Sequence, residues 1–256
     1  MQIRRLTTFS LLFAAGAAAG CTTDNTGGAD PDADPAVPYP ATCKELQAGN
    51  LSLSDAEYTL YVKNDAMKPW RAYCQNMSTS TPAEYLTLRR TGGDYNYGEF
   101  VQRTSAGQTS VRTSYIKLRI DPILMQIDIG DRTQASSNGQ TMFQNVMVNE
   151  VAFGVAAFCA TPPIAIGGGE DPKATGNIDL SGTHFVLADS FCVHNSQTGF
   201  AVQSSDHGRL DFAARIPSAG APFPSVSCAW VAPDPCPVDP WQPTTRGGLL
   251  NIEYSP

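Results

Sequence analysis

The residues best suited to metal chemistry are the three histidines, His184, His194 and His207. A zinc peptidase needs two histidines at i and i+4 on a helix, with a glutamate beside the first to activate the metal-bound water. Here the histidines follow one another at intervals of ten and thirteen residues in a turn-rich region, and Cys192 near His194 is expected in a disulfide. The sequence therefore predicts no metal site, and we expect no cofactor.

Nucleophilic and paired-carboxylate chemistry have candidate residues but no defining motif. His184, Asp189 and Ser190 lie close in sequence, with Ser181 as an alternative nucleophile, yet no G-x-S-x-G motif is present. A glycosidase pair could be drawn from four carboxylates on or near strands, Glu57, Glu84, Glu99 and Asp121. We expect solvated strand flanks there, and we assign no catalytic residue.

Aromatic side chains near glycine and proline turns are the candidates for ligand binding. Trp70 and Trp230 also lie near turns, but Trp70 falls within a strand pattern and is expected in the core. Trp241 is flanked by proline on either side in the segment DPWQP, which favours exposure. The possible binding residues are therefore Trp241, Tyr95 and Tyr97.

One cysteine of the seven is set apart by its position. The chain begins with a charged segment containing Arg4 and Arg5, followed by an apolar run that ends in Ala18-Ala19-Gly20-Cys21, the order of a signal peptide. The run is shorter than the about 20 apolar residues that span a bilayer. Its end resembles a bacterial lipobox, with Ala18 where leucine is preferred; the alternative is an ordinary cleavage site with an incidental cysteine. We expect a signal peptide over residues 1–20 and a lipid on Cys21.

The other six cysteines form an even set, which suits an oxidising compartment. They are Cys43, Cys74, Cys159, Cys192, Cys228 and Cys236. Spacing makes a bridge from Cys228 to Cys236 locally plausible. The formal net charge of -7 makes nucleic acid an improbable partner, because nucleic-acid binding calls for a basic patch.

Two regions follow the expected signal peptide. Residues 21–41 hold the lipidated cysteine and a run of Asp, Pro, Gly, Thr and Ala that cannot bury enough apolar area to fold, so we expect a disordered tether. Residues 42–256 contain no linker that demands a boundary, and we expect one domain.

Strand patterns dominate that domain, with apolar and polar residues alternating between turn residues. They cover 58–62, 70–74, 85–89, 115–120, 126–129, 185–188, 200–203 and 249–254. The segment 142–158 is ambiguous between strand and buried helix. The predicted fold is mainly β, a sandwich or a compact α+β assembly with few short helices, stapled by disulfides.

Six blocks of this domain carry a resemblance to a known family. They are 42–46 (TCKEL), 57–62 (EYTLYV), 73–77 (YCQNM), 82–88 (PAEYLTL), 96–99 (NYGE) and 116–127. In this order they resemble the GON domain, a module of secreted ADAMTS metalloproteases with similar single-domain bacterial versions. The resemblance is strongest over 42–136. A weaker resemblance to the start of fibrinogen-like domains ends early.

The resemblance implies a first disulfide between Cys43 and Cys74, whose sequence contexts flank one antiparallel strand set in such domains. This leaves Cys159 to pair with Cys192. The family usually has more cysteines in its middle part, whereas this chain has none between Cys74 and Cys159.

Two functions remain open. The first is an exported bacterial lipoprotein, held in the cell envelope by its N-terminal lipid, that displays a GON-like module to an envelope polysaccharide or a protein partner. Thr22 after the lipidated cysteine favours the outer membrane. The second, which the family association suggests, is an envelope hydrolase or a domain associated with a zinc metallopeptidase. The missing motifs favour the first.

Overall fold

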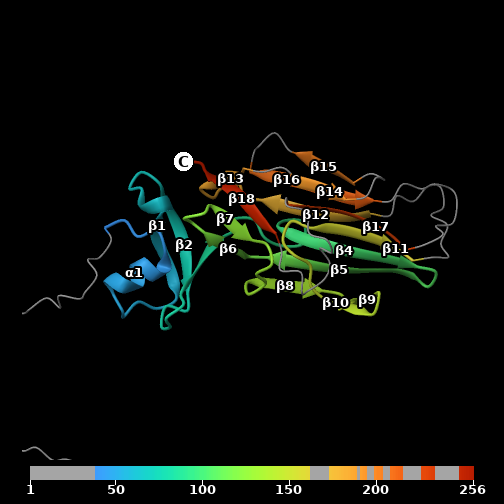
Figure 1. Ribbon diagram of the computed structural model, residues 1–256, viewed down its shortest axis with the longest axis horizontal. Coiled ribbons are helices and arrows are strands. Elements are labelled where there is room, and N and C mark those ends of the chain that lie inside the picture. The colour runs from blue at the N-terminus through green and yellow to red at the C-terminus, as the bar shows by residue number, and fades with distance from the viewer. Residues whose placement is uncertain are drawn as a thin grey trace, which may run out of the picture. The chain divides into compact units, whose positions relative to one another are not determined.

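Strands form nearly all of the regular structure in the computed structural model (Figure 1). The structure describes residues 38–161, 173–188, 191–194, 199–203, 208–215, 226–233 and 248–256. The chain divides into two units, residues 1–34 and residues 35–256, and all described residues belong to the second. Cys21 and the expected tether up to residue 37 lie outside the described residues.

The described part begins with one short helix, α1 (Cys43–Gly49). The Thr42 hydroxyl caps it by accepting the Glu45 backbone N–H at 3.1 Å, the usual role of threonine before a helix. A single 3-10 turn, η1 (Val62–Asn64), follows the first strand. The expectation of few short helices is therefore confirmed for the described residues.

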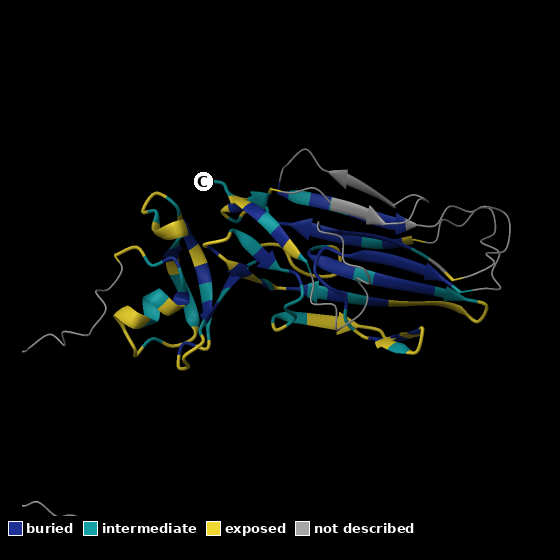
Figure 2. Cartoon of the chain, viewed as in Figure 1, coloured by how far each residue is buried: buried dark blue, intermediate teal, exposed yellow. Residues whose placement is uncertain are grey.

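The first sheet has seven strands, each antiparallel to its neighbours. In spatial order they are β1 (Ala56–Tyr61), β2 (Pro69–Gln75), β3 (Ala83–Thr87), β6 (Lys117–Asp121), β7 (Gln126–Asp128), β18 (Leu249–Tyr254) and β13 (Phe185–Leu187). Buried and less buried residues alternate along β2 and β6, as the period of two predicts for a sheet with one face on the core (Figure 2).

The second sheet has nine strands. Its main path is β14 (Phe191–His194), β17 (Ser227–Pro233), β11 (Ala156–Ala160), β4 (Tyr97–Thr104), β12 (Lys173–Asp179), β16 (Arg209–Arg215) and β15 (Gly199–Gln203). Off this path, β5 (Gly107–Tyr115) pairs with β4, and β8 (Ala135–Asn138) pairs with β5. β4 and β11 run parallel, unlike the other recorded pairs. β9 (Thr141–Phe143) and β10 (Val146–Val148) form a separate hairpin.

One hydrophobic cluster contains residues of both sheets. Trp70 from the first sheet meets Phe185 edge to face at 5.2 Å between ring centroids, and Tyr115 meets Phe153 in the same way at 5.2 Å. All five residues of β11 are buried, so this strand lies inside the core. The mainly β fold is confirmed. The helix alternative for 142–158 is wrong, because this segment forms the hairpin and β11.

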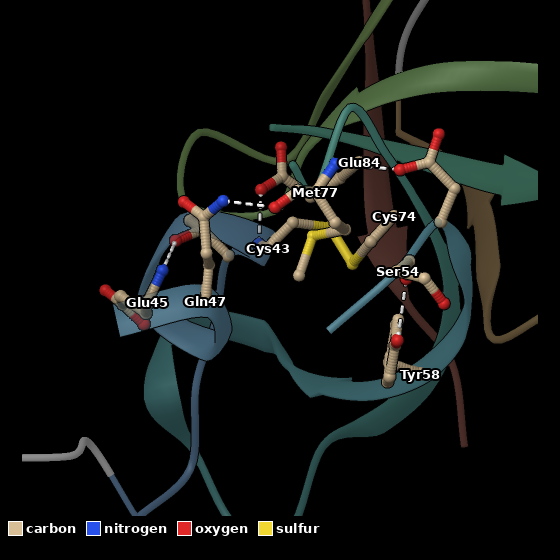
Figure 3. Close-up of a disulfide and its surroundings, with 10 residues drawn as sticks. Cys43, Glu45, Gln47, Ser54, Tyr58, Cys74, Met77 and Glu84 are labelled. Carbon is tan, nitrogen blue, oxygen red and sulfur yellow. Dashed lines mark hydrogen bonds between the residues drawn. A yellow bond between two sulfur atoms is a disulfide. The ribbon is translucent and has the colours of Figure 1, made fainter. Parts of the chain in front are cut away.

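Two disulfides are present among the described residues. Cys43 on α1 is joined to Cys74 on β2, so the pairing implied by the family resemblance is confirmed (Figure 3). Cys159 is joined to Cys228, and the expected pairs Cys159–Cys192 and Cys228–Cys236 are therefore wrong. β11 and β17 are antiparallel neighbours that place Cys159 directly opposite Cys228, with 4.2 Å between their Cα atoms. Cys159 and Cys228 are 69 residues apart in sequence. The pairing of their strands therefore determines this disulfide, which spacing along the chain could not predict.

Candidate functional site

The site begins on the face of the first sheet opposite Trp70 and Ala72. Because residues paired across a ladder share a face, Glu57, Tyr73, Tyr85 and Arg119 form one row across β1, β2, β3 and β6. The neighbouring positions carry further polar groups, with Thr59 opposite Arg71 and Thr87 opposite Lys117. This part of the sheet therefore presents cations, a carboxylate, hydroxyls and tyrosine rings together.

A pocket opens where β3 separates from β2. The recorded pairing of these strands ends at Ala72 and Leu86, and beyond it the Leu88 N–H donates to the Ile116 carbonyl at 3.1 Å. The pocket, of about 250 Å³, combines residues of β1, β2 and β3 with a turn that follows β12. We call it the Trp70 pocket; it is lined by Glu57, Trp70, Arg71, Leu86, Thr87, Arg89, Gly182, Thr183 and His184.

Contacts of the turn residues fix the far wall of the Trp70 pocket. Arg89 Nε donates to the Gly182 carbonyl at 3.2 Å, and the Thr183 hydroxyl donates to the Leu180 carbonyl at 2.7 Å. Gly182 has φ +76°, where an L side chain is strained, and a Cβ atom there would lie 3.2 Å from Arg89 Cγ. The His184 ring stacks on Tyr254 of β18, with 5.9 Å between ring centroids. These contacts connect the turn to Tyr254 of β18 and to Arg89, which lies two residues after the end of β3.

The charges in the Trp70 pocket are not balanced. Arg71 and Arg89 line it, and neither forms an ion pair with a described residue. Glu57 is the single carboxylate of the lining, and one of its oxygens accepts the Thr87 hydroxyl. An arginine is always protonated at physiological pH. The lining therefore carries a net positive charge within a chain of net charge -7.

The pocket also borders a hydrogen-bond donor that lacks a partner. Trp70 is 1% exposed, and its indole Nε1 has no hydrogen-bond partner among the described residues. A buried donor without an acceptor costs about 1–3 kcal/mol, which an oxygen of a bound molecule could offset. Arginine donors, a carboxylate acceptor and a buried indole together can bind a small polar molecule.

The structure brings two of the sequence candidates into this pocket and separates others. Glu57 and His184 both line it. Glu84 and Asp121 line another pocket, of about 450 Å³, and Glu99 pairs with Arg112 at 3.0 Å. The Ser181 hydroxyl donates to Asp179. The described residues therefore do not place the four carboxylates in one site.

The aromatic candidates occupy different environments. Tyr97 is 8% exposed, its hydroxyl donates to Thr175 at 3.0 Å, and Arg112 lies over its ring. A binding role for Tyr97 stays a prediction. Trp230 is also buried, at 5% exposed. Tyr95 is half-buried, and Arg90 lies 5.6 Å from its ring centroid. A binding role for Tyr95 stays a prediction.

Several candidates lie outside the described residues: Trp241, Cys236, His207, Asp189 and Ser190. His194 and Cys192 belong to β14. Within the described ranges, no group of three or more His, Cys, Asp or Glu side chains could hold a metal ion.

The sequence analysis missed Arg71, Thr87, Arg89 and Gly182. A threonine or arginine within a strand is usually a solvated side chain, and nothing in the spacing marks these as a group. Arg89 and Gly182 are 93 residues apart, and only the sheet brings them together. Gly182, two residues before His184, was the one available indication of a turn that carries a functional group.

Comparison with known proteins bears on the same strands. The GON domain family model matches residues 40–111, which run from α1 into β5. The resemblance to the GON domain is confirmed. The human protein "A disintegrin and metalloproteinase with thrombospondin motifs 20" is 25% identical over 193 residues, which cover 67% of this chain and 9% of that protein. No solved structure matches the chain. The GON match includes Glu57, Trp70, Arg71, Thr87 and Arg89, so the part of the pocket contributed by β1, β2 and β3 lies within it.

Proposed function

We propose that this chain is a binding protein of the bacterial cell envelope, anchored by a lipid on Cys21, and that the Trp70 pocket holds its ligand. The observation that carries the proposal is the composition of this pocket, where two arginines have no ion-pair partner, and a buried indole N–H has no acceptor, among the residues that the structure describes. Ligand-binding sites use a small number of polar groups of this kind to orient the ligand and to provide specificity. The wall formed by Gly182, Thr183 and His184 is fixed by its own contacts, so the site is formed before a ligand arrives.

The anchor is supported by the sequence order of charge, apolar run, small residues and Cys21. Disulfides at two places support folding outside the cytoplasm, and so does the similarity to a human disintegrin and metalloproteinase with thrombospondin motifs. Within the described residues no helix has the length and apolarity to cross a membrane. We place the lipid in the outer membrane on the basis of Thr22.

Mass spectrometry of the mature N-terminus tests the anchor. The expected result is a first residue Cys21 that carries acyl chains, lost in a Cys21→Ala variant, which should also leave the membrane fraction. An unmodified N-terminus at any other residue would refute the lipid anchor without affecting the binding proposal.

Binding is tested with the detergent-solubilised full chain on immobilised envelope polysaccharides and peptides. We expect retention that falls about tenfold in Arg89→Ala, because this change removes a charged donor from the pocket. Lys44→Ala, which removes an exposed cation on α1, should retain wild-type binding. Equal binding by wild type and Arg89→Ala would place the ligand elsewhere.

Hydrolysis is the second candidate function, and one observation favours it. Glu57 and His184 line the same pocket, so a carboxylate and an imidazole are available near one ligand. Turnover of casein and of envelope glycans, measured for wild type, Glu57→Gln and His184→Ala, discriminates the two functions. Activity in the wild type that both variants abolish would make the chain an envelope hydrolase.

A further inference from the structure

We infer that the ligand of the Trp70 pocket is an acidic saccharide, a hydroxylated sugar ring that carries a carboxylate or a sulfate. This inference rests on the proposed binding function and specifies its ligand. Three properties of the site lead to it: the sign of its charge, its mixture of donors and acceptors, and its size.

The charge favours an anion. Arg71 is exposed at the pocket, and the Arg89 guanidinium makes one hydrogen bond, through Nε to the Gly182 carbonyl. The outer nitrogens of both side chains therefore have no partner among the described residues. Guanidinium groups bind carboxylate and sulfate oxygens through paired N–H donors. An otherwise acidic chain thus concentrates positive charge at one pocket.

The mixture of polar groups favours a hydroxylated molecule over a simple anion. Glu57 keeps an oxygen beyond the one that accepts the Thr87 hydroxyl, and a carboxylate accepts hydrogen bonds from neutral hydroxyls. The Trp70 indole needs an acceptor. A sugar hydroxyl donates and accepts, so a single ring can satisfy the acceptor Glu57 and the donor Trp70. An isolated sulfate cannot do this, because it has no hydrogen to donate to Glu57.

The size favours one ring of a longer chain. A volume of about 250 Å³ is below the about 300–1,000 Å³ of sites for drug-sized molecules. Leu86 and Trp70 form the apolar part of the lining. Outside the pocket, Lys117 lies opposite Thr87 and over the Tyr73 ring, with Nζ 4.6 Å from the ring centroid. A further acidic unit would meet this cation on the same face of the sheet.

Calorimetric titration of the detergent-solubilised full chain tests the inference with four defined probes. They are polygalacturonate, dextran sulfate, neutral dextran and polyglutamate. We expect binding of polygalacturonate or dextran sulfate, and the stronger of these two identifies carboxylate or sulfate as the anion. Affinity should fall about tenfold in Arg71→Ala and in Arg89→Ala, remain unchanged in Lys44→Ala, and weaken as salt rises.

Trp70→Phe provides a second readout, because it removes the indole N–H and keeps an aromatic ring. We expect several-fold weaker binding of the acidic saccharide and the loss of a ligand-induced change in tryptophan fluorescence. The cooperative unfolding transition should be retained at a lower midpoint, because the smaller ring leaves a cavity in the core.

Other outcomes distinguish a failure of this inference from a failure of the proposed binding function. Dextran bound as tightly as the acidic polymers would overturn the inference, and polyglutamate bound as tightly would do the same, while the binding function would stand in both cases. If no saccharide or peptide is bound at all, the proposed binding function itself fails.

Discussion

Glu84 shows how one residue joins two parts of the fold. It lies on β3 opposite Cys74, and its carboxylate accepts the backbone N–H of Cys43, so it bonds to the helix that the first disulfide holds (Figure 3). Burial raises the pKa of the Glu84 carboxyl, and the Cys43 hydrogen bond opposes this only in part. The folded protein therefore favours the neutral form of this group more than the unfolded chain does.

This shift predicts a pH dependence of stability. Because the folded pKa lies above the unfolded value, the stabilisation by Glu84 is full below the unfolded pKa and is lost as pH rises through the folded pKa. Glu84→Gln keeps an acceptor for the Cys43 N–H and cannot ionise. We expect the decline in unfolding midpoint between pH 4 and pH 7 to be smaller in this variant, as measured by thermal unfolding. Glu253→Gln, at an exposed position of β18, should keep the wild-type profile, and identical profiles for wild type and Glu84→Gln would contradict the prediction.

The residues of the pocket differ in how well the sequence predicted them as functional. His184 and Glu57 attract notice because imidazole and carboxylate groups do chemistry, and Trp70 was correctly expected in the core. Arg71 and Arg89 attract none, because an arginine on or beside a strand is ordinarily solvated. Their role depends on the absence of an ion-pair partner among the residues that the structure describes, and no pattern along the chain predicts this.

At the scale of elements, the alternation of apolar and polar residues was the property of the sequence that best predicted the strands. Every predicted strand segment overlaps an observed strand, from 58–62 in β1 to 249–254 in β18. β11 could not be assigned in this way, because a strand buried on both faces does not alternate and resembles a buried helix. The order of strands in the sheets could not be predicted from the sequence either, because β18 pairs with β7 and β13, which are distant from it in sequence.

The disulfide between α1 and β2 gives a prediction about the helix. Replacing Cys43 and Cys74 together by alanine opens a link of sequence separation 31, which should lower the free energy of unfolding by about 3–4 kcal/mol through the entropy of the unfolded chain. Denaturant unfolding measures this loss, with Lys44→Ala as the control on the same helix. A double variant as stable as the wild type would contradict it.

At the scale of the whole molecule, the GON match and the unit of folding have different extents. The match ends at residue 111, inside β5 (Gly107–Tyr115). β3 pairs with β6, and β4 pairs with β11 and β12, all of which lie beyond the match. The resemblance therefore indicated a mainly β domain but not the partners that complete its sheets.

A fragment of residues 38–111 should consequently fail to fold. Its β3 and β4 would expose unpaired edges and the apolar face that the missing strands cover, so we expect a disordered far-ultraviolet circular dichroism spectrum and no cooperative thermal transition. Residues 38–256 should unfold cooperatively under the same conditions. A cooperative transition in the short fragment would show that the matched region is a domain by itself.

The position of β18 has a consequence for the timing of export. This strand lies between β7 and β13, so the first sheet stays open until residues 249–254 have been delivered. The stacking partner of His184 is Tyr254 of the same strand. Under the export that we propose, a chain still threading through the membrane has no complete sheet and no finished pocket. Translocation would then meet little resistance from premature folding, and ligand binding would begin only on the outside.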